Sequence, residues 1–283
     1  MKKNLHVWAM LMVVSLFTSA CKEVFVPSKE YITQKVSVDA FDAIEAHTAI
    51  KVVYTQVSTH QSIEVYAPDN MMEYIEVKVK NNTLVASLKL PKMGFVIKGD
   101  YTAEVRVTAP AVRKVTASSA SEIILERGLR NPNPVSLEAS SAAQIKSGKI
   151  TSQEVSLLAT SSGSITVKNI HSQGFKAESN SAGNINILEM SSEVVEAEAN
   201  SAGKVELKGN CMRATLTASS AGNLNASELT AGHVTADASS AGNVFCHANE
   251  SLKANASSAG NVKYKGEPKD LSIPEKGNVH RME

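Results

Sequence analysis

The sequence predicts an all-β protein, a parallel β-solenoid in which successive coils stack around one core. A seven-residue unit of the type Ala-Ser-Ser-Ala-Gly-Asn-Val recurs eight times, with starting points 18 to 22 residues apart. On both sides of the unit apolar and polar residues alternate, as they do in strands with one buried face. Coils of about 20 residues, stacked at the ~4.8 Å spacing of neighbouring strands, account for both observations.

Residues 1–20 have the features of a secretory signal peptide. Lys2 and Lys3 precede an apolar stretch, Leu5 to Phe17, that is too short to span a bilayer. Thr18-Ser-Ala-Cys21 resembles a bacterial lipobox, so we expect Cys21 to be lipidated and to become the N-terminus. The alternative is an ordinary signal cleaved nearby, which leaves Cys21 as a free thiol. Residues 21–35 are then the lipid-anchor Cys and a polar tether that lifts the fold off the membrane.

Residues 36–110 lack the repeated unit but are rich in predicted strands. Alternating segments such as Ile50–Val52 and Ile75–Val79 are separated by turn-like residues such as Asn81-Asn82. We expect wider, irregular coils that begin the solenoid and cap its end; the alternative is a separate small β-sandwich. Residues 111–283 then hold the regular repeats, closed by a C-terminal capping coil with a degenerate copy of the unit at 276–279.

The repeated unit predicts a tight corner in every coil. Its third residue is always Ser, and we expect each stacked hydroxyl to donate to one coil and accept from the next. Its fourth residue is Ala or Ser, as expected at an inside corner with little room. Its fifth is Gly in six copies, as expected where φ is positive or backbones crowd. These predicted turn residues are Ser119, Ser141, Ser161, Ser181, Ser201, Ser220, Ser240, Ser258, Gly163, Gly183, Gly203, Gly222, Gly242 and Gly260.

Several motifs give the chain a family resemblance. They are Phe41-Asp-Ala-Ile44, Val105-Arg-Val-Thr-Ala-Pro110, the repeated Ser-Ala-Gly-Asn-(Ile/Val) and the closing Gly277-Asn278-Val279. With them, about residues 36–280 resemble the family described as "putative auto-transporter adhesin, head GIN domain", whose members are common among secreted or lipidated proteins of Bacteroidetes. The resemblance implies a right-handed single-chain β-helix and a surface or adhesive role. It implies no particular binding residues.

Composition and spacing argue against catalysis and against nucleic-acid binding. Lys and Arg number 29 and Asp and Glu 28, so no basic excess is available to neutralise phosphates. No two Asp residues fall at equivalent repeat positions, and the Glu193, Glu196 and Glu198 group is interpreted as a solvated face. Cys246 is expected to be a buried small hydrophobe and Cys211 to lie in a loop, too far away for a disulfide. We predict no catalytic residue, no metal ligand and no cofactor.

The sequence therefore predicts a non-enzymatic lipoprotein of the cell envelope, an adhesin or structural surface module. We expect it to be exported, held in the membrane (the outer membrane) by its N-terminal lipid, and exposed at the surface. A glycan or extracellular protein would bind its flat Ser/Thr/Asn-rich faces or its irregular loops at 91–103 and 127–134. The apolar loop 91–99 is either such a patch or an end cap over the first coil.

Two alternatives remain open. One is a scaffold or sensor that faces the periplasm. The other, less favoured, is a polysaccharide-active β-helix enzyme, which requires Glu or Asp residues stacked on one face.

Overall fold

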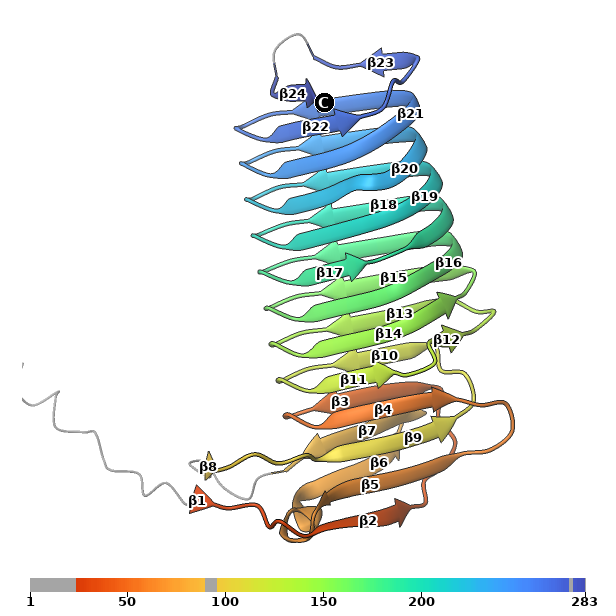
Figure 1. The fold of residues 1–283 in the computed structure, drawn as a ribbon, viewed down its shortest axis with the longest axis vertical. Coiled ribbons are helices and arrows are strands. Elements are labelled where there is room, and N and C mark those ends of the chain that lie inside the picture. The colour runs from red at the N-terminus through yellow and green to blue at the C-terminus, as the bar shows by residue number, and fades with distance from the viewer. Residues whose placement is uncertain (1–23, 90–95, 275–276, 283) are drawn as a thin grey trace, which may run out of the picture.

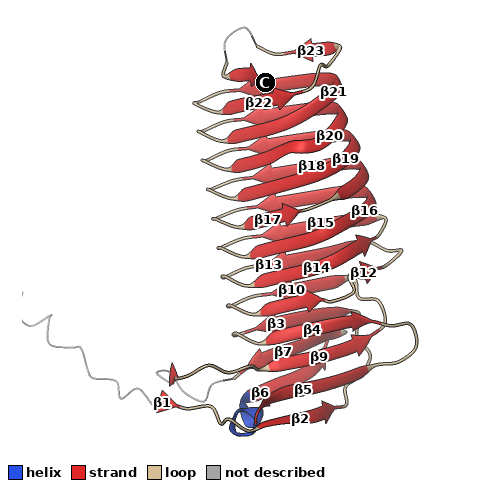
Figure 2. Cartoon of the chain, viewed as in Figure 1, coloured by secondary structure: helices blue, strands red, loops and turns tan. Residues whose placement is uncertain are grey.

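A computed structural model describes residues 24–89, 96–274 and 277–282. The predicted signal peptide, Cys21 and residues 91–95 of the apolar loop lie outside these ranges. The chain forms a β-solenoid of about eight turns that stands on an irregular N-terminal β portion (Figure 1), which confirms the predicted fold class. Strands dominate the described chain, with one short 3₁₀ helix, η1 (Asp69–Tyr74), near its N-terminal end (Figure 2). In the described ranges no helix is long and apolar enough to cross a membrane.

Each coil has three faces. The first face holds the strands before the repeated turn, the second face holds those after it, and a short third face lies at the far edge of the coil. Several long strands bend from one face to the next. The strands of the stack after the N-terminal portion are β10 (Lys114–Ala117), β11 (Glu122–Leu125), β12 (Leu129–Arg130), β13 (Val135–Ala139), β14 (Gln144–Thr151), β15 (Glu154–Ala159), β16 (Ser164–Ser179), β17 (Asn184–Ile187), β18 (Met190–Ala199), β19 (Lys204–Ala218), β20 (Asn223–Ala238), β21 (Asn243–Ala256), β22 (Asn261–Lys265), β23 (Asp270–Ser272) and β24 (Val279–Arg281).

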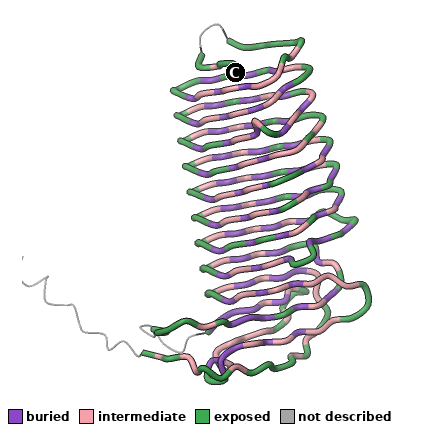
Figure 3. Tube along the Cα trace, viewed as in Figure 1, coloured by how far each residue is buried: buried purple, intermediate pink, exposed green. Residues whose placement is uncertain are grey.

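Neighbouring coils pair in parallel, and equivalent residues lie directly above one another. On the first face, for example, Val135 pairs with Val155, which pairs with Phe175 and then Val195. These side chains are all buried, and buried and exposed residues alternate along every coil (Figure 3). Burial of such apolar columns is the main stabilising term of the stack. One continuous hydrophobic core runs from Ile44 to Tyr264.

The N-terminal portion differs from the expected wide coils. Its outer strands are antiparallel: β2 pairs with β5, β5 with β9, and β6 with β7. Two of them then continue the solenoid faces in parallel, β7 beside β3 and β9 beside β4. The strands are β1 (Val24–Phe25), β2 (Tyr31–Val36), β3 (Ala43–His47), β4 (Lys51–Gln56), β5 (Ser62–Pro68), β6 (Ile75–Lys80), β7 (Thr83–Leu88), β8 (Val96–Ile97) and β9 (Glu104–Ala109).

The regular stack begins one coil earlier than the repeated unit indicates. β3 and β4 pair in parallel with β10 and β11, and the turn that joins them has the same backbone shape as the repeated turns, with φ of 56° at Thr48 and 55° at Ala49. This coil has no Ser-Ala-Gly signature, which is why the sequence placed it in the irregular portion. Strand β2 likewise occupies residues expected to form a tether.

Candidate functional site

The predicted turn residues lie at one edge of the stack, but their hydroxyl groups do not stack as expected. In each copy the third and fourth residues, such as Ser220 and Ala221, both have φ between 47° and 63°, the pattern of a type I′ turn. Their side chains point to solvent, so the fourth residue is not an inside corner. Among the described residues no hydrogen bond joins two of the third-position hydroxyls. The backbone makes the ladder instead: the Ala221 N–H donates to the Ser240 carbonyl 3.0 Å away, and every other copy except the last repeats this bond.

The repeated glycines are favoured because the backbone of the preceding coil lies close to them, and not because their φ is positive. A Cβ on Gly222 would lie 1.9 Å from the carbonyl oxygen of Ala199 in the preceding coil, and one on Gly242 would lie 2.4 Å from that of Ala218. At the first repeat, where Gly is replaced by Ser121, the side chain instead donates a hydrogen bond of 2.9 Å to the equivalent carbonyl, on Ala46. This edge is therefore a structural element of the fold, without a concave surface of its own.

A second polar column, which sequence reasoning missed, lies inside the opposite corner. Ser152, Ser172 and Ser192 are buried there at equivalent positions, and the hydroxyls of Ser172 and Ser192 are 2.8 Å apart. The next coil places Cys211 beside Ser192, within strand β19 and not in the expected loop. Cys246 is fully buried in a different column, as predicted, and both cysteines are free. Burial raises the pKa of Cys246 to about 12 and that of Cys211 to about 11.

Acidic residues stack on the outer side of the first face, an arrangement that the sequence analysis did not identify. Through the strand register, Glu138, Glu178, Glu198 and Asp237 occupy one column, in which Glu178 and Glu198 are direct neighbours. Lys176 pairs with Glu178 at 2.7 Å. The two carboxylates project side by side from one sheet, whereas glycosidic hydrolysis needs a pair that flanks the bond to be broken. Within the described ranges no three His, Cys, Asp or Glu side chains are placed to hold a metal ion.

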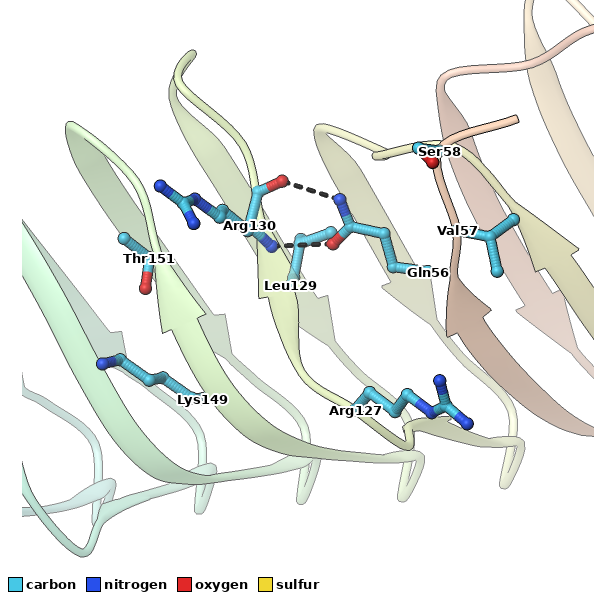
Figure 4. Close-up of a pocket in the computed structure, with 8 residues that line it drawn as sticks. All are labelled: Gln56, Val57, Ser58, Arg127, Leu129, Arg130, Lys149 and Thr151. Atoms are coloured by element: carbon cyan, nitrogen blue, oxygen red, sulfur yellow. Dashed lines mark hydrogen bonds between the residues drawn. The ribbon is translucent and has the colours of Figure 1, made fainter. Parts of the chain in front are cut away.

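The best candidate for a binding site is a hollow of about 500 Å³ on the third face, where the stack meets the N-terminal portion (Figure 4). We call it the basic hollow. It is built where β12, the first strand of the third face, has no partner strand in the coil before it, because the chain leaves β4 at Gln56 and runs to β5. The hollow is lined by Gln56, Val57, Ser58, Arg127, Leu129, Arg130, Lys149 and Thr151.

A side chain closes the open edge of β12. The Gln56 amide nitrogen donates to the Arg130 carbonyl at 2.8 Å, and the Arg130 N–H donates to the Gln56 amide oxygen, also at 2.8 Å (Figure 4). These are the bonds that a neighbouring strand would supply. They hold the backbone of Arg130 in place while its guanidinium extends away from Gln56 into solvent.

Two glycines bring together the backbone segments that carry Arg127 and Lys149. Gly128 has φ of 79°, and a Cβ on it would lie 2.0 Å from the Lys149 carbonyl oxygen. A Cβ on Gly148, in the next coil, would meet the Gly128 nitrogen at 3.2 Å. The chain therefore turns tightly between Arg127 and Leu129, directly against the strand that carries Lys149.

The charge of the hollow is not balanced from within. Its lining contains two arginines and a lysine and no acidic residue. All three cations are exposed, and none of them forms an ion pair within the part of the chain that the structure describes. Guanidinium and ammonium groups at the rim of one hollow, without a counter-charge, are suited to binding an anion.

A second hollow, of about 530 Å³ on the first face, differs in this respect. It forms over the small residues Ser136, Ser156 and Gly174. Its cations are already neutralised, because Lys114 pairs with Glu138 at 2.9 Å, Arg113 with Asp42 at 2.6 Å and Lys176 with Glu178 at 2.7 Å. The basic hollow is therefore the stronger candidate for a charged ligand.

Comparison with known proteins gives the fold a family. The family model described as "putative auto-transporter adhesin, head GIN domain" matches residues 40–168 and 149–268. The chain belongs to this family. The matches confirm the resemblance seen in the motifs. The matched residues include the coil formed by β3 and β4 and the loop at 127–130 that lines the basic hollow. No curated protein matches the chain.

Solved structures of Bacteroidetes proteins share the head GIN fold. A putative adhesin from Parabacteroides distasonis ATCC 8503 is 18% identical with a TM-score of 0.65, over 92% of this chain and 100% of that one. A putative adhesin from Parabacteroides merdae ATCC 43184 is also 18% identical, with a TM-score of 0.63 and the same coverage. One from Bacteroides fragilis NCTC 9343 is 24% identical with a TM-score of 0.50, over 91% and 98% of the two chains.

Proposed function

We propose that this head GIN protein is a non-enzymatic, adhesin-like module of the cell envelope that binds an acidic glycan in the basic hollow. In this proposal the protein is exported, anchored through a lipid on Cys21, and holds the solenoid outside the membrane. The observation that carries the glycan assignment is that Arg127, Arg130 and Lys149 line one hollow whose lining contains no acidic residue.

The lining suits a charged sugar better than an apolar ligand. Arg side chains recognise carboxylates and sulfates through paired hydrogen bonds. Ser58, Thr151 and the edge of Gln56 add polar groups, and Leu129 is a buried floor. A protein segment would need a larger apolar surface than this hollow offers. The membership of an adhesin family supports the same class of function.

The absence of an enzymatic role is supported by the arrangement of the carboxylates. The stacked column of Glu178 and Glu198 is the feature that a polysaccharide-active enzyme requires, but its members point the same way from one sheet. Neither of them lines the basic hollow or the hollow on the first face, and Lys176 already neutralises Glu178. General acid–base catalysis needs two groups on either side of the reacting bond.

Polysaccharide binding tests the proposal. The mature protein would be titrated with a sulfated chain (heparin), a polyuronate (alginate) and neutral dextran, at low and at raised salt. We expect heparin or alginate to bind, dextran not to bind, and salt to weaken binding. The triple variant Arg127→Gln, Arg130→Gln, Lys149→Gln should bind at least about tenfold more weakly, because the loss of even one charge-assisted hydrogen bond costs about 1.5 kcal/mol.

A matched triple variant, Lys80→Gln, Arg213→Gln, Lys253→Gln, removes the same charge from exposed side chains outside the hollow. It should bind acidic polysaccharides almost as the unmodified protein does. An equal loss of affinity in the two triple variants would show that binding depends on overall charge and not on the hollow. Failure of every acidic chain to bind would refute the glycan assignment.

A further inference from the structure

Two short strands form an apolar flap beside the point where the predicted lipid would be attached. β1 and β8 pair in parallel and form a two-stranded sheet of their own, separate from the solenoid sheets. Figure 1 shows them to one side of the N-terminal end of the stack. The apolar loop that contains Val96 and Ile97 was expected to be either an exposed patch or a cap over the first coil. Its described part pairs with β1 and not with that coil.

The outer side of this flap is apolar. Val24 lies opposite Val96 in the register, and Val26 follows on the same side as Val24. The exposed fractions are 55% for Val24, 62% for Val26 and 41% for Val96. The alternate residue, Phe25, faces inward, where its ring meets that of Tyr74 edge-on at 5.6 Å. The side of the sheet that would ordinarily be polar is thus formed by three valines.

Elsewhere in the described chain the exposed apolar residues Leu271 and Ile273 lie close together, at the C-terminal end. Leu188 and Met212 are exposed singly on the solenoid, which is normal for a soluble surface. The flap, by contrast, brings three exposed valines together and begins at Val24, three residues after Cys21. An extended stretch of that length spans about 10 Å, so a lipid on Cys21 holds the flap at the bilayer surface.

We infer that the β1–β8 flap is a membrane-contact surface: the side chains of Val24, Val26 and Val96 insert into the interface of the bilayer that carries the lipid anchor. This inference rests on the anchoring part of the proposed function. It assigns the residues directly after Cys21, from Val24 to Val26, to membrane contact and not to a free tether. Small apolar groups add membrane affinity to a lipid chain, because their buried area adds to that of the acyl chain.

The flap also sets the direction in which the solenoid presents its ligand site. In Figure 1 β12, which carries Arg130, lies on the opposite side of the stack from β1 and β8. A flap in contact with lipid therefore leaves the basic hollow turned away from the membrane. An acidic glycan would reach it without competition from lipid headgroups.

A single-tryptophan reporter tests the inference. The only Trp of the sequence, Trp8, lies within the predicted signal peptide, so the mature chain has none. Val96→Trp places a reporter on the flap, and Met212→Trp places a matched reporter on an exposed apolar site of the solenoid. Both are made in a mature chain carrying Cys211→Ala and coupled through Cys21 to a maleimide lipid in phosphatidylcholine vesicles. The anchor is thereby supplied chemically.

With brominated lipid in the vesicles, the flap reporter should lose about half of its fluorescence or more, because interfacial side chains reach the boundary of headgroups and acyl chains. The Met212→Trp reporter should be unchanged. Equal fluorescence of the flap reporter in brominated and ordinary vesicles would overturn the inference, as would equal quenching of both reporters. Natural lipidation is tested apart from this, by the mass of the N-terminal residue of protein made in its host. The quenching experiment and the mass measurement can therefore fail independently of each other.

Discussion

The side chain of Gln56 substitutes for a strand against the backbone of Arg130. Two hydrogen bonds of 2.8 Å join the Gln56 amide to the N–H and the carbonyl of Arg130. They satisfy the outer edge of β12 at the point where the third face begins. An open strand edge is otherwise a row of unpaired donors and acceptors.

Replacing Gln56 should therefore weaken this junction. Gln56→Ala leaves the Arg130 N–H and carbonyl without protein partners, and we expect a loss of about 1–2 kcal/mol in the free energy of unfolding. Urea denaturation measures it. Gln153→Ala, on an exposed Gln of the next coil, is the control and should change stability by less than about 0.5 kcal/mol. Equal stabilities of the two variants would show that water replaces the Gln56 amide.

Two adjacent turn residues should respond in opposite directions. Gly222→Ala forces a Cβ to 1.9 Å from the Ala199 carbonyl, and we expect a loss of about 2 kcal/mol or more as the coils move apart. Ala221 has φ of 60°, so Ala221→Gly relieves left-handed strain and should be neutral or stabilising by up to about 1 kcal/mol. Thermal melts compare the two variants. Destabilisation by Ala221→Gly would mean that the left-handed backbone of Ala221 is not strained.

The ion pairs of Glu104 should make stability depend on pH. Burial acts to raise the pKa of this carboxyl, but hydrogen bonds from Lys51 and Arg106 outweigh it, and the pKa lies below the ordinary value of 4.5. The carboxylate side chain is only 12% exposed and lies 2.8 Å from Lys51. Because the folded pKa is the lower one, its contribution is present above about pH 4.5 and is lost as the pH falls through the folded value.

Glu104→Gln should therefore cost about 1–2 kcal/mol at pH 7, after allowance for partial exposure, and less as the pH falls below 4.5. Denaturant unfolding of both proteins at pH 7 and at pH 3 provides the comparison. An unchanged difference at the two pH values would contradict the role of the charge.

The two cysteines of the described solenoid, Cys211 and Cys246, should be protected from thiol reagents by the fold. With a pKa of about 12, Cys246 holds only about one thiolate per 10,000 molecules at pH 8, and it is fully buried. We expect dithionitrobenzoate to react with Cys246 only after unfolding in guanidinium. Cys211, half-buried with a pKa of about 11, should react slowly before Cys246. A Cys246→Ala variant assigns the signals, and rapid reaction of a folded Cys246 would contradict its placement.

The location of the module is tested on whole cells. An adhesin must be accessible from outside, so we expect proteinase K to digest the protein on intact cells. A known periplasmic protein in the same cells is the control and should survive until permeabilisation. Protection of both proteins on intact cells would favour a scaffold or sensor facing the periplasm.

Much of the fold could be predicted because its signals are local. The repeated unit specifies a turn, and the alternation beside it specifies which side chains face inward, as for Val155 and Phe175. The first coil was missed because Thr48-Ala49 makes the same turn without the sequence signature. Local pattern reading also misjudged Cys211, since a strand that bends between faces changes the register of the residues beyond the bend. The acidic column, by contrast, can be read from the sequence, because each of its members directly precedes a copy of the repeated unit.

By itself the sequence determined the period of the coil, its inward-facing residues and the position of its turns, because these depend on contacts a few residues apart. Only the tertiary structure decided what surrounds each turn. Gly is favoured at six of the eight turns because a carbonyl of the preceding coil lies against it. The left-handed conformation is adopted by the two residues before it, which are Ser and Ala in most copies.

The candidate site also belongs to the tertiary structure. Gln56, Arg127 and Lys149 are far apart in the chain and meet because coils stack in register around an N-terminal portion whose antiparallel order the sequence did not specify. Local periodicity fixes how each coil folds. The stacking of coils fixes which charges meet.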